Sequence, residues 1–136
     1  SKHLNFTSQY SIIGGTEEDE TGMEVPVRHV APAFGNTHFV WTKNKLKLDA
    51  YVNYNGELSN NDLSPSVADY LFALDENGKP YAPSWYTLNF RAKYNVLPNL
   101  EITSSVENIT NQRYRVYSSG ITAPGLNFIT SIKYSL

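Results

Sequence analysis

The stretch that decides the fold is Gly125-Leu-Asn-Phe-Ile-Thr-Ser-Ile-Lys-Tyr-Ser-Leu136. Every second residue, counted from Leu126 and Phe128, falls on a face that is mainly apolar and aromatic. The residues between them form a more polar face. A period of two is typical of a β-strand with one apolar side. The stretch therefore predicts an amphipathic strand over residues 126–136, of the kind that a barrel-closing strand needs.

Five earlier segments alternate in the same way, so the chain is expected to be all-β. The six strands expected in an antiparallel meander cover residues 3–13, 33–42, 45–56, 85–96, 100–108 and 126–136. Most are longer than the usual ~5–6 residues of strands in soluble proteins. Their length is close to the ~9–11 residues with which a tilted strand crosses a bilayer.

The join between the second and third strands is short enough to suggest a register. A two-residue turn at 43–44 would set Trp41 opposite Leu46 on the apolar face. Asn44 is suited to such a turn because asparagine tolerates a positive φ. The same register would set His38 opposite Asp49 on the polar face, where we expect a hydrogen bond.

The join between the fourth and fifth strands also restricts the register. A three-residue turn at 97–99 would set Tyr94 opposite Ile102 on the apolar face. A register shifted by one residue would mix the two faces, because each side chain would change sides. In this register Lys93 lies diagonally from Glu101, and we expect the two to pair.

The connections alternate in length along the chain, which indicates an outer-membrane type of barrel. They run long, short, long, short, long, so the long loops gather at one end of the sheet and the short turns at the other. Aromatic residues of the apolar face lie near both ends of the strands, as expected at two membrane interfaces. Those at the long-loop end are Tyr10, Tyr54, Tyr86 and Phe128, and those at the short-turn end are Trp41, Tyr94 and Tyr134.

Composition excludes several functional classes. The chain has no cysteine, so it has neither disulfides nor thiolate metal sites. Its net charge of −2 gives no basic surface for nucleic acid. The three histidines are widely spaced, and we expect no metal site. No catalytic triad, phosphate-binding loop or pair of carboxylates in a pocket context is recognisable, so we expect no enzyme.

The chain resembles the C-terminal part of TonB-dependent outer-membrane receptors over nearly its whole length. The stretches that carry the resemblance are Val106-Glu-Asn-Ile-Thr-Asn-Gln-Arg-Tyr114, Ala123-Pro-Gly-Leu-Asn-Phe128, Ile132-Lys-Tyr-Ser-Leu136, Val30-Ala-Pro-Ala-Phe-Gly35, Tyr51-Val-Asn-Tyr-Asn-Gly56 and Pro83-Ser-Trp-Tyr-Thr-Leu-Asn-Phe-Arg91. Two positions depart from the family pattern. Leu126 stands where the family often has Arg, and Leu136 stands where the family usually ends in Phe.

The resemblance implies a barrel of ~22 strands with a plugged lumen, of which residues 1–136 would be the last part. The plug domain and the segment that contacts TonB would then lie outside these residues. The parent receptor would bind and import a scarce ligand, most simply a ferric siderophore or other iron complex, with haem and cobalamin as further classes. Its location would be the outer membrane of a Gram-negative bacterium, and its partners the rest of the barrel, the plug, TonB and lipid.

The sequence also suggests where ligand and lumen contacts lie. Aromatic and arginine side chains of the long loops are the candidate ligand-binding residues: Tyr70, Trp85, Arg113, Tyr114, Arg115 and Tyr117. Charged side chains of the polar strand face are expected to face the lumen: Lys47, Asp49, Arg91, Lys93, Glu101 and Glu107.

Two other interpretations of the sequence stay open at this point. A soluble β-sandwich module for carbohydrate binding or adhesion would show the same alternation, because its apolar face would be buried within one chain. A small complete barrel is the other possibility, although six strands fall below the smallest bacterial outer-membrane barrels of ~8. An isolated six-stranded sheet would have two bare edges. It would therefore belong to a nicked or divided receptor whose remainder lies in other chains, or it would be an excised piece that buries its apolar face against a copy of itself.

Overall fold

The computed structural model describes residues 2–66 and 69–136 and consists of one large antiparallel sheet with long loops. The order of strands in the sheet is β1 (Leu4–Ser11), β4 (Phe34–Lys43), β5 (Leu46–Asn55), β8 (Trp85–Leu97), β9 (Leu100–Glu107) and β10 (Asn127–Tyr134). Each strand pairs with the next long strand of the chain, so the sheet is a meander. The expected all-β meander of six strands is confirmed.

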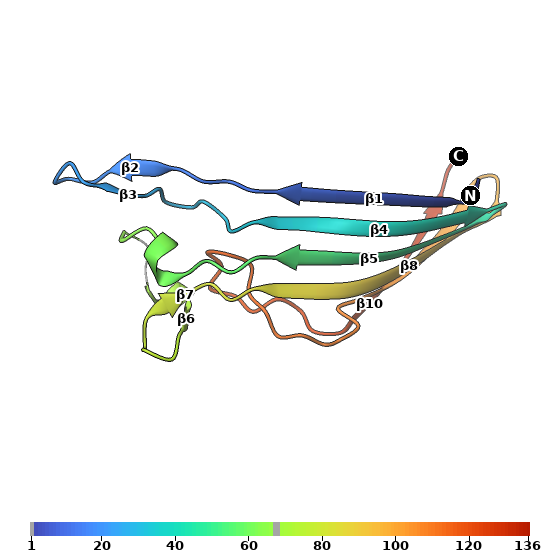
Figure 1. Ribbon diagram of the computed structural model, residues 1–136. Coiled ribbons are helices and arrows are strands. Elements are labelled where there is room, and N and C mark those ends of the chain that lie inside the picture. The colour runs from blue at the N-terminus through green and yellow to red at the C-terminus, as the bar shows by residue number, and fades with distance from the viewer. Residues whose placement is uncertain (1, 67–68) are drawn as a thin grey trace.

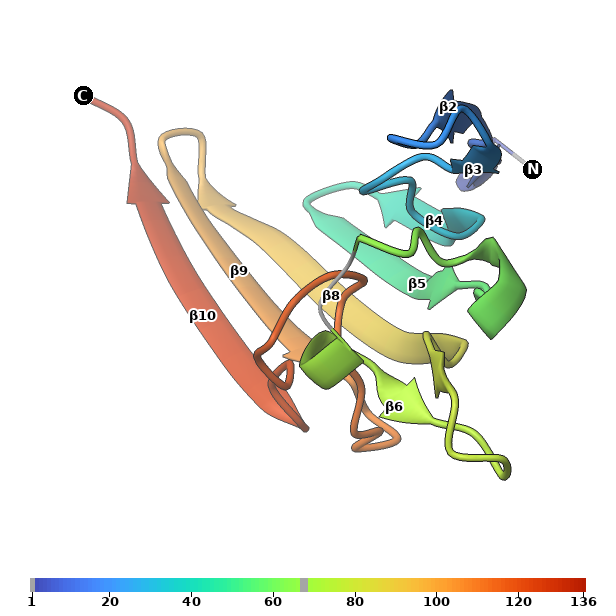
Figure 2. The ribbon, with the colours of Figure 1, turned by 90° about the vertical axis from the view of Figure 1, so that its left-hand side faces the viewer.

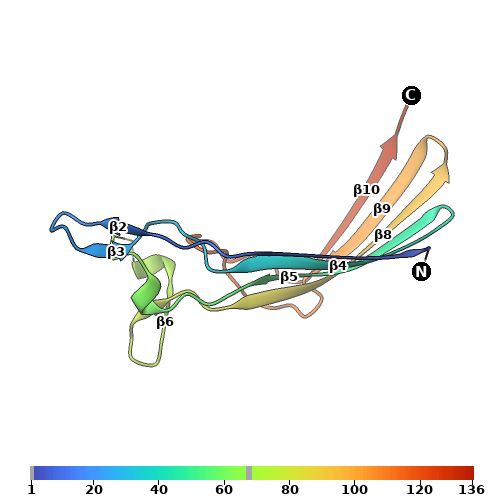
Figure 3. The same ribbon diagram turned by 45° about the horizontal axis from the view of Figure 1, so that its top comes forward.

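The long loops carry small elements of their own. The smaller elements are the hairpin of β2 (Thr16–Glu18) and β3 (Glu24–Pro26), the hairpin of β6 (Ala73–Leu74) and β7 (Pro80–Tyr81), and the 3₁₀ turns η1 (Asn60–Asp62) and η2 (Asp69–Leu71). Figure 1 shows both hairpins at one end of the sheet and the two termini at the other. The first hairpin lies in a segment that the sequence indicated only as a loop. Figures 2 and 3 show that the sheet is twisted and curved between β1 and β10.

The register of β4 and β5 differs by two residues from the one expected. Trp41 lies opposite Leu48 rather than Leu46, because the turn is Asn44-Lys45 and not 43–44. Asn44 takes the first turn position with a φ of 52°, which asparagine adopts more readily than most residues. A shift of two leaves every side chain on its expected face. His38 is therefore diagonal to Asp49 instead of directly opposite.

The register of β8 and β9 is the one expected, and a β-bulge makes it possible. Tyr94 lies opposite Ile102 and Phe90 lies opposite Val106, which confirms the predicted pairs. The register shifts between Asn95 and Leu97, so that one extra residue stands in β8 before the turn. Such a bulge lets a short turn join the strands without mixing the apolar and polar faces.

The outermost strands are shorter than the alternation suggested. β1 covers Leu4–Ser11 rather than 3–13, and β10 ends at Tyr134 although the alternation continues to Leu136. One more cross-strand bond follows the end of β10, from Ser135 N to Asn99 O at 2.9 Å. An edge strand pairs on one side only, which is why its ends lose the ladder first.

Burial in the sheet is the reverse of that in a soluble domain. The residues of the apolar face that are most exposed are Phe6, Phe39, Tyr10, Phe128, Ile132 and Tyr134, each at 52–71%. By contrast, the buried strand residues lie on the polar face and are Asp49, Tyr51, Thr87, Asn89 and Ser105. Nothing within the described part of the chain covers the apolar face. A sandwich module would need a second sheet there.

Tyrosines form a row across the apolar face at the long-loop end. Tyr54 lies opposite Tyr86 in β8 and opposite Gly35 in β4, and Gly35 lies opposite Tyr10 in β1. The rings of Tyr10 and Tyr54 stack over Gly35 with centroids 6.2 Å apart. A Cβ at Gly35 would collide with the Tyr54 ring, so this close approach requires glycine. The row holds three of the four aromatic residues expected at this end, whereas Phe128 lies opposite Val106 in the central row of the apolar face, which also holds Phe90.

A second aromatic group lies toward the short turns. Tyr94 and Trp41 belong to the same face as the tyrosine row, and Tyr94 follows Tyr86 by eight residues of β8. At about 3.3 Å per residue, this separation is roughly 26 Å along the strand, which is roughly 18–21 Å along the membrane normal for a strand tilted by about 35–45°. The apolar band between the two aromatic girdles of outer-membrane barrels is about 25 Å tall, so the two aromatic groups lie slightly closer together than that height. No described helix of this chain is long and apolar enough to cross a membrane.

Candidate ligand-binding site

The loop after β9 is held to the sheet by one buried asparagine. Asn108 has a φ of 51° and is 3% exposed. Its Nδ2 donates to the carbonyl oxygens of Gln112 at 2.8 Å and Pro124 at 3.1 Å, and its Oδ1 accepts from Gln112 N at 2.9 Å. The two ends of the loop are thereby tied to one side chain. The Val106–Tyr114 stretch therefore has a structural role, which is to hold the two ends of this loop together.

The same asparagine connects the loop to β8. Asn108 N donates to Asn89 Oδ1 at 2.9 Å, and Asn89 Nδ2 in turn donates to Tyr51 O at 3.3 Å and Thr87 O at 3.0 Å. Gln112 Oε1 accepts from Tyr86 N at 3.0 Å. Because Asn89 and Asn108 are buried, each of their bonds left unmade would cost about 1–3 kcal/mol. The loop that follows therefore starts from a rigid base.

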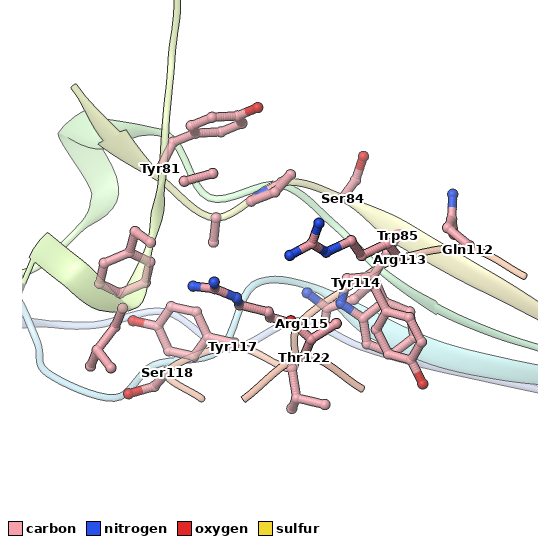
Figure 4. A pocket seen from close by; sticks show the side chains of 17 residues that line it. Tyr81, Ser84, Trp85, Gln112, Arg113, Tyr114, Arg115, Tyr117, Ser118 and Thr122 are labelled. Carbon is pink, nitrogen blue, oxygen red and sulfur yellow. The ribbon is translucent and has the colours of Figure 1, made fainter. Parts of the chain in front are cut away.

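This loop forms one side of a pocket of about 330 Å³ at the long-loop end of the sheet, here called the arginine pocket. Its chemically distinctive lining residues are Phe72, Tyr81, Trp85, Arg113, Tyr114, Arg115 and Tyr117. The opposite side comes from the loop between β5 and β8. In Figure 4 the side chains of Arg113 and Arg115 reach across the middle of this pocket.

Aromatic contacts shape the walls of the arginine pocket. The rings of Trp85 and Tyr114 have centroids 4.2 Å apart, and those of Phe72 and Tyr117 lie 5.9 Å apart. Trp85 Nε1 is buried and has no hydrogen-bond partner. An unpaired indole N–H is a donor that a bound ligand can satisfy.

The charge of the arginine pocket is positive. Arg113 and Arg115 line it, no acidic residue does so among the described residues, and neither arginine makes an ion pair there. Burial raises the pKa of the Tyr114 phenol, with a further rise from the charge of Glu107, and burial also raises the pKa of Tyr117. Both phenols therefore stay neutral near pH 7 and can donate hydrogen bonds. The pocket can bind an anionic group with an aromatic surface.

A charged network follows the polar face below the pocket. His38 Nδ1 lies 2.9 Å from Asp49 Oδ1, so the expected contact is present in a diagonal arrangement. The rings of Tyr51 and His38 stack with their centroids 4.9 Å apart. The Arg91 guanidinium lies 5.2 Å from the centroid of the Tyr51 ring. Arg91 donates to Tyr51 Oη, which donates to Glu107 Oε1, both at 3.2 Å.

Lys93 and Glu101 form the ion pair that their diagonal positions predicted. Lys47, Asp49, Arg91, Lys93 and Glu107 also line a shallow hollow of about 410 Å³ on the polar face. All six charged residues expected to face the lumen are strand residues of this polar face. Five of the six take part in cross-strand contacts, which are Asp49 with His38, Arg91 with Glu107, and Lys93 with Glu101.

The structure brings five of the six candidate ligand residues together. Trp85, Arg113, Tyr114, Arg115 and Tyr117 line the arginine pocket, whereas Tyr70 is 80% exposed and does not line it. Phe72, Tyr81 and Gln112 line the pocket and were missed by the sequence reasoning. No periodicity marks them, because Phe72 and Gln112 lie in loops and Tyr81 lies in the two-residue strand β7. Among the described residues, no group of three histidine or acidic side chains could hold a metal ion.

Comparisons with known proteins address the fold. No protein-family profile and no curated protein matches the sequence. Among solved structures, the chain is similar to the copper transporter OprC, with a TM-score of 0.81, 10% identity and coverage of 100% of this chain and 21% of OprC. It is similar to the ferric enterobactin receptor PfeA of Pseudomonas aeruginosa, with a TM-score of 0.68, 17% identity and coverage of 98% and 20%.

The siderophore receptor PiuA of Acinetobacter baumannii is a third similar structure, with a TM-score of 0.63, 15% identity and coverage of 98% and 20%. The chain thus has the fold of a segment of a large transmembrane β-barrel, and it spans about a fifth of the length of these proteins. At 10–17% identity, the similarity to these solved structures concerns the fold alone.

Proposed function

We propose that this chain is part of a TonB-dependent outer-membrane receptor that binds and imports a scarce ligand. Two features support the proposal. The fold is that of a segment of such barrels, and the sheet leaves its apolar face exposed between two aromatic groups, whereas Asp49, Thr87 and Asn89 of the polar face are buried. That distribution suits a wall with lipid on one side and a polar lumen on the other. The outer membrane of a Gram-negative bacterium is the matching location.

The proposed ligand is a ferric siderophore or other anionic iron complex. The observation that carries this choice is the arginine pocket, where Arg113 and Arg115 lie among Trp85, Tyr114 and Tyr117 and no acidic residue of the described part of the chain lines the pocket. Guanidinium groups bind anionic oxygen donors, and aromatic rings pack on the flat surfaces of aromatic chelators. Two of the similar solved structures are titled as receptors for ferric enterobactin and for a siderophore.

The proposed partners follow from the surfaces of the sheet. The edges β1 and β10 would pair with further strands of the barrel, the apolar face would contact lipid, and the charged polar face would contact a plug. TonB would act through a segment outside residues 1–136. Binding and import need no covalent step, so the proposed role is that of a receptor and not of an enzyme.

The test measures binding of a ferric tris-catecholate complex to the complete protein that contains this chain, purified in detergent. The double variant Arg113→Gln/Arg115→Gln removes both cations and keeps hydrogen-bonding side chains. Loss of two charge-assisted contacts of about 1.5–3 kcal/mol each predicts at least a hundred-fold weaker binding. Quenching of tryptophan fluorescence gives the affinity.

Arg28→Gln is the matched control, because Arg28 lies in another long loop and does not line the arginine pocket. We expect it to bind the complex like the unchanged protein. If the double variant binds as tightly as Arg28→Gln, the arginine pocket is not the anion site. If no ferric complex binds the unchanged protein, the choice of ligand is wrong.

A further inference from the structure

A second pocket, of about 540 Å³, lies beside the arginine pocket and has different chemistry. It is here called the amide pocket, after Asn36, Asn53 and Asn55, which line it with Phe34 and Trp85. The sheet register builds it in two adjacent rows. In one row Asn36 lies opposite Asn53, and in the next row Asn55 lies between Phe34 and Trp85. Amides and flat rings therefore stand side by side on the polar face.

The amides of this pocket are largely free of partners within the chain. The side chain of Asn53 makes no hydrogen bond with any other described residue, whereas its backbone belongs to the sheet ladder. Asn36 Nδ2 has one long bond of 3.4 Å to Gln9 Oε1, and Asn55 Nδ2 donates at 3.1 Å to the carbonyl of the adjacent Gly56. The Oδ1 atoms of Asn36 and Asn55 and both ends of the Asn53 amide can therefore bind a ligand.

The charge of the amide pocket distinguishes it from its neighbour. No Asp, Glu, Lys or Arg lines it among the described residues, whereas two arginines line the arginine pocket. The two pockets share Asn55, Trp85 and Val116–Ser118 as a common wall. A ligand can thus contact a cationic pocket and a neutral one without leaving this end of the sheet.

We propose that the amide pocket binds a neutral, hydroxyl-rich group of the saccharide type. Hydroxyl groups both donate and accept hydrogen bonds, which is what side-chain amides offer, and an apolar sugar face packs on aromatic rings such as Phe34 and Trp85. A charged group would find no carboxylate, lysine or arginine partner among the described lining residues, which include one histidine, His29. The saccharide has two possible sources, a free oligosaccharide or a sugar attached to the anionic complex, and the second rests on the function proposed above.

The experiment uses the complete protein in a detergent without sugar, such as an amine oxide. Its first arm titrates neutral gluco-, galacto- and manno-oligosaccharides of two to four residues by calorimetry. Its second arm compares a glucosylated ferric tris-catecholate with the same complex without glucose. The variant Asn53→Leu removes the free amide, and Asn36→Ala is a second variant in case the first perturbs folding.

We expect Asn53→Leu to weaken saccharide binding about ten-fold, which corresponds to one or two lost hydrogen bonds. The matched control is Asn95→Leu, the same change on the polar face of β8 at the short-turn end, which should leave binding unchanged. A response in the first arm identifies a free oligosaccharide. Tighter binding of the glucosylated complex, lost only in the Asn53 and Asn36 variants, identifies an attached sugar.

The inference is overturned if no oligosaccharide binds and glucose adds nothing to the affinity of the ferric complex. It is also overturned if saccharide binding is the same in Asn53→Leu, Asn36→Ala and Asn95→Leu. The complex without glucose reports on the function proposed above by itself. Its binding can persist when the saccharide inference fails, and it can fail when saccharides bind.

Discussion

The two faces of the sheet have opposite relations to burial. On the apolar face, Phe6 is 58% and Phe39 is 52% exposed, whereas on the polar face Thr87 is 3% and Asn89 is 5% exposed. In a soluble domain the apolar residues would be buried and the polar ones exposed. Here loop residues cover the long-loop end of the polar face and a cross-strand network joins its middle, whereas no described residue covers the apolar face.

This comparison shows which interactions must come from the chain and which from its surroundings. Asn89 and Asn108 satisfy one another and the adjacent backbone, so the interior of the long-loop end is a hydrogen-bonded one. Exposed aromatic rows of this size are costly in water, at about 25 cal/mol per Å² of apolar surface. The sheet is therefore suited to a lipid environment rather than to water.

The largest expected effect comes from a charge on the apolar face. Phe6 belongs to the central row of that face, opposite Phe39, and Thr7 is its neighbour on the polar face. In the complete protein in phospholipid vesicles, Phe6→Arg should lower the free energy of unfolding by about 2–4 kcal/mol. Denaturant unfolding gives the value. Thr7→Arg should change the free energy of unfolding by much less. Equal effects at the two positions would contradict the assignment of the apolar face to lipid.

The next effect concerns the buried end of the polar face. Asn108→Ala removes three side-chain hydrogen bonds and should destabilise the protein by about 2–3 kcal/mol, with faster protease cleavage between residues 109 and 126. Asn108→Gly loses the same bonds but tolerates the positive φ, so it should be less harmful by roughly 1 kcal/mol. Limited proteolysis and denaturant unfolding measure both. An unchanged cleavage rate would contradict the role of Asn108.

A smaller effect is expected in the middle of the polar face. Tyr51→Phe keeps the ring between His38 and Arg91 but removes the hydroxyl that bonds to Arg91 and Glu107. Tyr51→Phe should lower the free energy of unfolding by about 1 kcal/mol, since one partly buried hydroxyl with two hydrogen-bond partners is lost. Tyr54→Phe is the control, because its hydroxyl bonds only to Gln9 O at the aromatic belt. A larger loss of stability for Tyr54→Phe than for Tyr51→Phe would contradict a stabilising role for the Tyr51, Arg91 and Glu107 hydrogen bonds.

The smallest effect belongs to the partly exposed ion pair of Lys93 and Glu101. A double-mutant cycle with Lys93→Met and Glu101→Gln should give a coupling of about 0.5 kcal/mol, because solvent screens the pair. The coupling should fall when the salt concentration is raised from about 0.05 to 0.5 M. A coupling that salt does not change would mean that this part of the polar face is not reached by water.

Much of the fold could be predicted from the sequence because the alternation of apolar and polar residues assigns each side chain to the correct face even where a turn is misplaced by one residue. The turn between β4 and β5 lies one residue later than expected, and the register moved by two, yet every side chain kept its face. The pairs across β8 and β9 were correct, although the β-bulge that allows them has no sequence signal of its own. The hairpin β2–β3 was missed because three-residue strands show no clear period.

The candidate site was predictable only in part. Arginine and aromatic side chains in the long loops stood out by type, and five of them share one pocket in the structure. Tyr70 belongs to the same type but does not line that pocket, because its place depends on how the loop after β5 folds back. Asn108 lay within a noted motif, but its role as the anchor of the loop depends on partners 16 and 19 residues away.

The sequence by itself determined the two faces of the sheet, because a strand period of two assigns each side chain to a side without knowledge of any partner. It also determined the alternation of long loops and short turns, and hence the end at which the loops gather. Only the tertiary structure decided which loop residues meet in the arginine pocket and how the register lines up the asparagines of the amide pocket. Those features are contacts between distant segments, and local pattern carries no information about the path by which a loop returns to the sheet.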